Sequence, residues 1–133
     1  MATKKLNILW LDDDIDIFDE VTRPMREQGC KFKSIRSKKE FLEEIDRLND
    51  YNLVILDIII PEGEIKEKQD PYPGLSVLET IKQRTPNLPV LVLTVVTNKE
   101  VLEKIKELRV AGLIRKPVLP SDLENVVNSV TNS

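Results

Sequence analysis

Short runs of consecutive apolar residues alternate along this chain with longer stretches in which apolar residues recur every three or four positions. The runs are typical of strands that are buried on both faces of a sheet, and the stretches are typical of amphipathic helices. The runs predict strands at residues 6–11, 30–35, 53–56, 88–94 and 110–115. A helical stretch follows each run, so the sequence predicts a strand and a helix repeated five times.

The first predicted helix has sequence signals at both ends. Asp14 or Asp16 can cap its first turn, and Gly29 ends it. Pro24 falls inside the helical pattern, where proline costs about 3 kcal/mol unless the helix kinks or restarts, and we expect a kink. The next strand begins at Cys30, which we expect to be a small buried residue, and this strand is predicted at an edge of the sheet.

The remaining helices are predicted from their start signals and their apolar faces. Ser or Thr followed three residues later by Glu forms a capping box, which satisfies backbone N–H groups at a helix start. Such boxes occur at Ser37 with Glu40, Thr97 with Glu100 and Ser121 with Glu124. The third helix is predicted from about Gly74 to Thr85. The residues expected to face inward on the helix after Ser37 are Phe41, Leu42, Ile45 and Leu48.

Regular alternation of strands and helices implies a parallel sheet with helices on both faces. Ligands of such sheets bind at the carboxyl ends of the strands, where the strand order reverses. The length of 133 residues predicts one domain over residues 1–133. Residues 61–74 are polar and rich in proline, and they predict a longer connection between strand and helix than is usual.

Composition excludes several classes of function. The chain has no histidine, which removes Ser-His-Asp and Cys-His nucleophile systems and leaves no credible zinc site. A net charge of −3 gives no electrostatic case for binding nucleic acid. No apolar run is long enough for a signal peptide or a membrane span, so we expect a cytoplasmic protein. The single cysteine, Cys30, cannot form an internal disulfide.

Charged or hydroxyl side chains stand at the ends of four predicted strands: Asp12, Asp13 and Asp14 after the first, Asp57 at the third, Thr94 at the fourth and Lys116 at the fifth. These ends share one edge of a parallel sheet, so the side chains are expected to converge. Carboxylates about 4 Å apart repel each other by roughly 1–4 kcal/mol per pair at effective dielectric constants of 80 to 20. A hard divalent cation relieves this repulsion. The sequence therefore predicts a site for Mg²⁺, or for Mn²⁺ in its place.

Phosphoryl transfer is the chemistry that suits such a site, because it needs little beyond positioning and neutralisation of charge. Asp57 can act as the nucleophile. The cation and Lys116 can offset charge on the phosphoryl oxygens, and the hydroxyl of Thr94 can bond the product group.

These motifs, in this order and spacing, resemble the receiver domain of two-component response regulators, the CheY-like superfamily. The residues that carry the resemblance are Asp12-Asp13-Asp14, Leu56-Asp57-Ile58-Ile59-Ile60-Pro61, Thr94 and Lys116-Pro117. The resemblance covers essentially the whole chain. It implies a flavodoxin-like (βα)5 fold, with a doubly wound parallel sheet of strand order 2-1-3-4-5. It also implies a signalling domain that assists its own phosphorylation and dephosphorylation and is not a turnover enzyme.

The resemblance implies a role for each acidic residue. Asp57 would accept a phosphoryl group from a histidine kinase or a His-phosphotransfer protein, and it would also face the Mg²⁺. Asp13 would bind Mg²⁺ directly and Asp12 largely through water, and the backbone carbonyl of Ile59 would be a further ligand.

The other site residues would report the state of Asp57. Thr94 would be the switch hydroxyl, and Lys116 would pair first with Asp57 and then with the phosphoryl group. The family usually keeps the Lys116–Pro117 bond cis. The final helix and the faces beside it are where relatives form homodimers or dock output partners.

Four features depart from the family pattern. Leu113 occupies a position that is commonly aromatic, and Val95 occupies one that is commonly small. The connection at 61–74 carries roughly nine residues more than that of a typical receiver. Ile59 and Val96 fill the two positions whose side chains help to place the hydrolytic water in relatives. Because both are aliphatic, we predict slow autodephosphorylation.

Three readings of the function stay open at this point. The first is a phosphorylated receiver, either a stand-alone protein or a piece of a longer regulator. The second is an interaction module of the same fold that has lost its switch, as Leu113 and Val95 suggest. The third is a haloacid-dehalogenase-like phosphatase, since Asp12-x-Asp14 after a buried strand matches part of that motif, although Asp16 stands where that family has Thr or Val.

Overall fold

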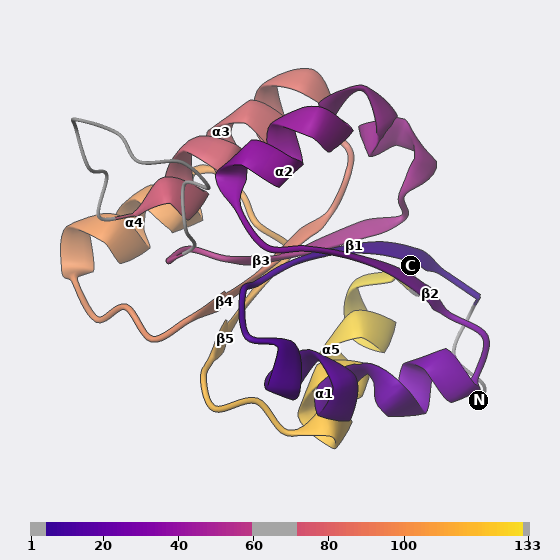
Figure 1. Ribbon diagram of the computed structural model, residues 1–133. Coiled ribbons are helices and arrows are strands. Elements are labelled where there is room, and N and C mark those ends of the chain that lie inside the picture. The colour runs from indigo at the N-terminus through magenta and orange to yellow at the C-terminus, as the bar shows by residue number, and fades with distance from the viewer. Residues whose placement is uncertain (1–4, 60–71, 132–133) are drawn as a thin grey trace.

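The computed structural model describes residues 5–59 and 72–131, which form one five-stranded sheet between two layers of helices (Figure 1). The strands are β1 (Asn7–Leu11), β2 (Lys31–Ile35), β3 (Leu53–Asp57), β4 (Val90–Thr94) and β5 (Gly112–Arg115). They lie in the order β2-β1-β3-β4-β5, and every neighbouring pair is parallel. The predicted fold class, strand order and edge position of β2 are confirmed.

The helices divide between the two faces of the sheet. They are α1 (Ile15–Glu27), α2 (Lys38–Glu44) with a 3-10 turn η1 (Ile45–Asp50), α3 (Pro73–Arg84), α4 (Lys99–Glu107) and α5 (Pro120–Thr131). Figure 1 shows α2, α3 and α4 on one face and α1 and α5 on the other. Within the described residues no helix is long and apolar enough to cross a membrane.

Each face of the sheet carries its own core. Successive residues of β1 point to opposite faces, so Leu9 packs with α2, α3 and α4, whereas Trp10 packs with α1 and α5. All five residues of β3 are buried because both faces are covered, as the uninterrupted apolar run predicts. Each of the four apolar side chains, Leu53 to Leu56, contributes about 1.5–3 kcal/mol through burial. Trp10 and Cys30 are buried, as expected.

Helix α1 has the predicted ends. The side chain of Asp14 caps it by accepting from the Ile17 N–H at 3.2 Å. After the helix, the N–H of Gly29 donates to the Arg26 carbonyl, and Gly29 takes a positive φ of 105° that residues with a side chain rarely adopt. The helix continues through Pro24.

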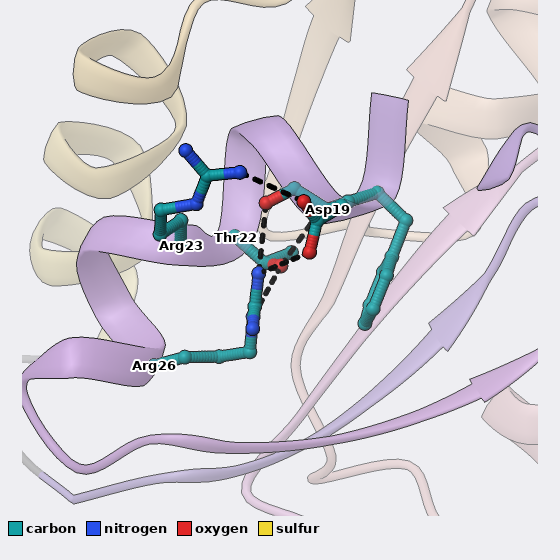
Figure 2. Close-up of polar contacts among 5 residues, drawn as sticks. Asp19, Thr22, Arg23 and Arg26 are labelled. Atoms are coloured by element: carbon teal, nitrogen blue, oxygen red, sulfur yellow. Dashed lines mark hydrogen bonds and ion pairs between the residues drawn. The ribbon is translucent and has the colours of Figure 1, made fainter. Parts of the chain in front are cut away.

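Polar side chains support the second half of α1 around this proline, as Figure 2 shows. The guanidinium of Arg26 donates to the backbone carbonyl and to the carboxylate of Asp19, and also to the hydroxyl of Thr22. Arg23 pairs with the other carboxylate oxygen of Asp19 at 2.8 Å. These contacts link residues on both sides of Pro24.

Two of the predicted helix starts are wrong. Asn98, not Thr97, caps α4, and its side chain accepts from the N–H groups of Glu100 and Val101. Asn98 and Thr97 are adjacent and both residue types are favoured as N-caps, so the sequence pattern could not identify which of them caps the helix. Ser121 lies inside α5, which begins at Pro120, a residue favoured in the first turn because it needs no N–H partner.

The box at Ser37 is half formed. The Ser37 hydroxyl accepts from the Glu40 N–H at 3.1 Å, but the Glu40 carboxylate accepts from the N–H of Arg36. Leu42 was expected to face inward and is 52% exposed. The inward position on this helix is taken by Glu44, whose buried carboxylate accepts a 2.6 Å hydrogen bond from the hydroxyl of Tyr51.

The expected long connection at residues 61–74 lies almost wholly outside the described residues. The described part begins again just before α3, and Gly74 in the first turn of that helix packs against the chain that follows β3. The N–H of Gly74 donates to the carbonyl of Ile58 at 2.8 Å.

Candidate functional site

The predicted acidic residues lie together at the carboxyl edge of the sheet. Asp57 is the last residue of β3, and Asp12 directly follows β1, the neighbouring strand. The strand order reverses here, because β2 lies on one side of β1 while β3, β4 and β5 follow on the other. This is the position at which doubly wound sheets bind ligands.

Three carboxylates form the centre of this site. One oxygen each from Asp12, Asp13 and Asp57 lies within 4.8 Å of the others. Asp12 and Asp57 are almost fully buried, with 2% and 5% of their surface exposed, whereas Asp13 is exposed. A buried carboxylate is costly unless a cation or hydrogen-bond donors reach it, so two of them side by side need a partner.

Lys116 supplies the one partner cation that the described residues provide. Its ammonium lies 2.8 Å from Oδ2 of Asp57 and 2.8 Å from Oδ2 of Asp12. Its backbone N–H donates to the carbonyl of Thr94, which fixes the start of the segment after β5 to the end of β4. The bond between Lys116 and Pro117 is cis, as the resemblance implies.

Backbone groups hold the second oxygen of each buried carboxylate. Oδ1 of Asp57 accepts from the Ile59 N–H at 3.0 Å, and Oδ1 of Asp12 accepts from the Asp14 N–H at 3.0 Å. These short local bonds orient both side chains and direct each Oδ2 towards Lys116.

The charges on Asp57 and Lys116 shift each other's titration. Burial raises the pKa of Asp57 above its ordinary value, and the hydrogen bonds from Lys116 and from the Ile59 N–H offset only part of that effect. Burial favours the neutral form of Lys116, but its contacts with Asp12 and Asp57 outweigh burial and raise the pKa of its ammonium. Lys116 is therefore charged at neutral pH, and it is the ammonium that faces two of the three clustered carboxyl groups.

The donor set fits a hard cation such as Mg²⁺. Oδ2 of Asp12 is buried, and within the described residues it makes only the ion pair with Lys116 and no hydrogen bond of favourable geometry. This oxygen and the neighbouring carboxylates of Asp13 and Asp57 are the oxygen ligands that Mg²⁺ prefers, and the exposure of Asp13 leaves one side open to water.

Thr94 and Ile59 lie at the same edge, but with different surroundings. The hydroxyl of Thr94 is fully buried and accepts from the Val96 N–H at 2.9 Å. Its position is one residue beyond the partner of Asp57 in the β3–β4 register. Ile59 follows the acidic residue by two positions, and its side chain is 42% exposed.

Gly74 is a site residue that the sequence motifs did not identify. A Cβ at this position would lie 2.5 Å from the carbonyl oxygen of Asp57 and 2.5 Å from the Cα of Ile58. Only glycine lets α3 approach the backbone beside the acidic residue this closely. The signal was the single glycine at the predicted start of the third helix, after a proline-rich stretch.

Sequence comparison agrees with this geometry. A sequence profile of the response regulator receiver domain matches residues 8–128. The chain belongs to this family. Receiver domains of response regulators are signalling domains, so this membership is consistent with two-component signalling and argues against the phosphatase reading.

Two curated relatives are longer than this receiver domain. The chain is 29% identical over 123 residues to the two-component response regulator ARR21 of Arabidopsis thaliana, a match that covers 92% of the chain and 18% of ARR21. It is 24% identical over 124 residues to the response regulator SaeR of Staphylococcus aureus, covering 93% of the chain and 50% of SaeR. The chain thus spans half or less of the length of these relatives.

Solved receiver domains share the fold. A receiver domain from Methanospirillum hungatei superposes with a TM-score of 0.81 at 23% identity, covering 97% of this chain and 95% of that chain. The chemotaxis response regulator CheY4 of Vibrio cholerae gives 0.76 at 20% identity, covering 96% and 99%. The beryllofluoride-activated receiver domain of DrrB gives 0.75 at 24% identity, covering 98% and 100%.

Proposed function

We propose that this receiver domain accepts a phosphoryl group on Asp57 from a histidine kinase or a His-phosphotransfer protein and thereby changes its surface for a partner. The observation that carries the proposal is the arrangement around Lys116, whose ammonium lies 2.8 Å from both Asp57 and Asp12 at the edge where Asp13 adds a third carboxylate.

The transfer balances without any further reactant. The carboxylate of Asp57 attacks the phosphorus of a phosphohistidine, an O–P bond forms, and the N–P bond breaks with its electron pair leaving on the imidazole. None of the 133 residues is histidine, so the phosphohistidine must lie outside this sequence. The product is an acyl phosphate on Asp57.

A divalent cation fits beside the acceptor and would neutralise charge on the phosphoryl oxygens when bound. Asp13 and Asp57 would hold it directly, Asp12 largely through water, and the backbone carbonyl of Ile59 would complete the protein ligands. The proximity of the three carboxylates and the single ion pair made by Oδ2 of Asp12 support this assignment.

Two further side chains would act on the phosphoryl group. Lys116, already charged and bound to Asp57, would remain paired with the oxygens of the new anion. The hydroxyl of Thr94 accepts one hydrogen bond and still has a proton to donate, so it can bond a phosphoryl oxygen after turning from its present partner. These two residues would pass the change at Asp57 to the ends of β4 and β5.

Acetyl phosphate with Mg²⁺ tests the proposal directly. Intact-mass measurement should show the addition of one phosphoryl group to the wild type and none to Asp57→Asn. Asp46→Asn is the matched control, because its carboxylate is 88% exposed and pairs only with Arg84 among the described residues, and this variant should be labelled normally. Labelling that survives in Asp57→Asn would place the acceptor elsewhere.

Fluorescence of Trp10 gives a second readout, since this buried side chain lies two residues before Asp12. The wild type should respond to Mg²⁺ and then to beryllofluoride, a phosphoryl mimic, and Asp57→Asn should lose the second response. Loss of both labelling and beryllofluoride binding in the wild type would favour an interaction module without a switch. The aliphatic residues Leu113 and Val95, which are 38% and 56% exposed, are the features that favour that alternative.

A further inference from the structure

Arg115 makes a contact that links the end of β5 to the loop after β4. One guanidinium nitrogen, Nη1, donates to the backbone carbonyl of Val96 at 3.1 Å. Arg115 is also the strand partner of Thr94 in the β4–β5 register. It directly precedes Lys116, which forms an ion pair with Asp57. Arg115 is therefore a neighbour of both Thr94 and Lys116, the two residues that would respond to a change at Asp57.

The backbone of Val96 is held from both sides. Its N–H donates to the hydroxyl of Thr94 at 2.9 Å, and its carbonyl accepts from Arg115. Its side chain is buried in the core between the sheet and α2, α3 and α4, whereas Val95 beside it is 56% exposed. The conformation of this loop thus depends on two hydrogen bonds at Val96. One is with Thr94 at the acidic site, and the other is with Arg115 at the end of β5.

We propose that Arg115 is a positioning residue that holds Val96 in place and so keeps the Thr94 hydroxyl bonded to the Val96 N–H instead of to a group on Asp57. The inference rests on the proposed function of Asp57. Arg115 touches neither the acceptor nor a phosphoryl group and acts through the loop.

The energetics follow from the contacts of the threonine hydroxyl. When Thr94 turns to donate to an oxygen on Asp57, the buried N–H of Val96 loses its acceptor and its peptide must move to find another. Arg115 opposes that movement by holding the carbonyl of the same residue. Removing the arginine contact therefore shifts the loop towards the state in which Thr94 faces Asp57.

The positive charge of Arg115 predicts the opposite effect of its removal on beryllofluoride binding. An experiment can therefore separate the effect of the charge from that of the hydrogen bond. Loss of a positive charge near an anionic ligand weakens anion binding. Loss of a contact that holds the resting loop strengthens it. The variant Arg115→Met removes the charge and the donors and keeps a long aliphatic stem. Arg36→Met, at an exposed arginine beyond β2 on the other edge of the sheet, is the control of equal charge change.

Beryllofluoride titration with saturating Mg²⁺ is the first measurement. We expect Arg115→Met to bind beryllofluoride about threefold to tenfold more tightly than the wild type, since a hydrogen bond of this kind changes an equilibrium by roughly that factor. Arg36→Met should bind like the wild type. Unchanged or weaker binding by Arg115→Met overturns the proposal.

Amide hydrogen exchange at Val96, without Mg²⁺ or beryllofluoride, is the second measurement. Exchange should become several-fold faster in Arg115→Met and stay unchanged in Arg36→Met, because only the first loosens the peptide of Val96. Unchanged exchange in Arg115→Met refutes the role of the arginine whatever the ligand data show. If the wild type binds no beryllofluoride, the proposed function of Asp57 fails, and the exchange rates still show separately whether Arg115 holds the loop.

Discussion

Gly74 at the start of α3 packs directly on the backbone of Ile58, the residue after the acceptor, where a Cβ would lie 2.5 Å from the Ile58 Cα. The neighbouring backbone cannot move aside as a side chain can. Gly74→Ala should therefore lower the free energy of unfolding by about 1–3 kcal/mol and weaken Mg²⁺ binding, because Ile58 lies between Asp57 and Ile59.

Gly112→Ala is the matched control for that variant. A Cβ at position 112 would meet a flexible methyl of Leu91 at 2.8 Å, and no carboxylate of the site lies within 4 Å of it. Gly74→Ala should lose clearly more stability than Gly112→Ala in urea unfolding, because the Leu91 methyl can move aside, and only Gly74→Ala should lose Mg²⁺ affinity in a Trp10 fluorescence titration. Normal Mg²⁺ binding by Gly74→Ala would show that this close approach does not shape the site.

Asp57→Asn should be more stable than the wild type when divalent cations are removed. Burial raises the pKa of Asp57 above its ordinary value of 3.8, so the folded state holds a proton that the unfolded state has already released. Wild-type stability therefore falls as the pH rises from the ordinary pKa through the raised one. Asparagine has no such loss, and its advantage at neutral pH should be on the order of 1 kcal/mol, because repulsion from Asp12 is also relieved.

Urea unfolding in EDTA from pH 4, just above the ordinary carboxyl pKa, to pH 8 checks this prediction. The difference between Asp57→Asn and the wild type should shrink towards the acidic end and reach its full size at neutral pH. Asp46→Asn, at an exposed carboxylate, should not show the same pattern. A destabilised Asp57→Asn at neutral pH would mean that the bond from Lys116 outweighs burial of the acid.

Lys116→Met should destabilise the protein, because it leaves Asp12 and Asp57 buried without a cation. The free energy of unfolding should fall by about 2 kcal/mol at neutral pH. This is less than the roughly 3–5 kcal/mol for breaking a fully buried pair, because the Lys116 side chain is 14% exposed. Added Mg²⁺ should restore part of that loss in thermal unfolding. Lys104→Met is the control, because its 4.0 Å pair with Glu79 is a surface contact of small effect.

The sequence predicted the sheet and the acidic cluster for the same physical reason. Parallel strands buried on both faces must be apolar along their whole length, so the single acid Asp57 after Leu53–Leu56 identified both the end of a strand and the position of the site.

Tertiary contacts determined the features that local sequence patterns did not predict. Glu44 occupies an inward position because the hydroxyl of Tyr51 reaches it, and Leu42 turns outward. The role of Gly74 depends on a backbone that a long connection separates from it in sequence.

Arg26 should matter more for stability than Arg23, although both pair with Asp19. Arg26 donates to the Asp19 backbone and to the Thr22 hydroxyl, and its guanidinium lies 5.9 Å from the centre of the Phe18 ring, whereas Arg23 makes one ion pair with a carboxylate that is 60% exposed (Figure 2). Arg26→Ala should therefore lower the urea midpoint clearly, and Arg23→Ala should change it little. The Arg26 effect should persist at high salt, because packing and neutral acceptors carry part of it. Equal losses in both variants would contradict this ranking.

The acyl phosphate on Asp57 should be long-lived, because no polar side chain at Ile59 or Val96 can orient an attacking water. Val96 is buried in the core, so only Ile59, which is 42% exposed, can be changed without disturbing packing. Ile59→Asn should shorten the lifetime by about tenfold, well below the roughly 10²–10⁴-fold effect of a positioned acid or base, since an amide can orient water but cannot take its proton. Phosphate release from protein labelled with acetyl phosphate and freed of the donor measures this rate, with Ile59→Val as the aliphatic control. A wild-type lifetime of minutes or less, or equal rates for all three proteins, would show that these two positions do not limit hydrolysis.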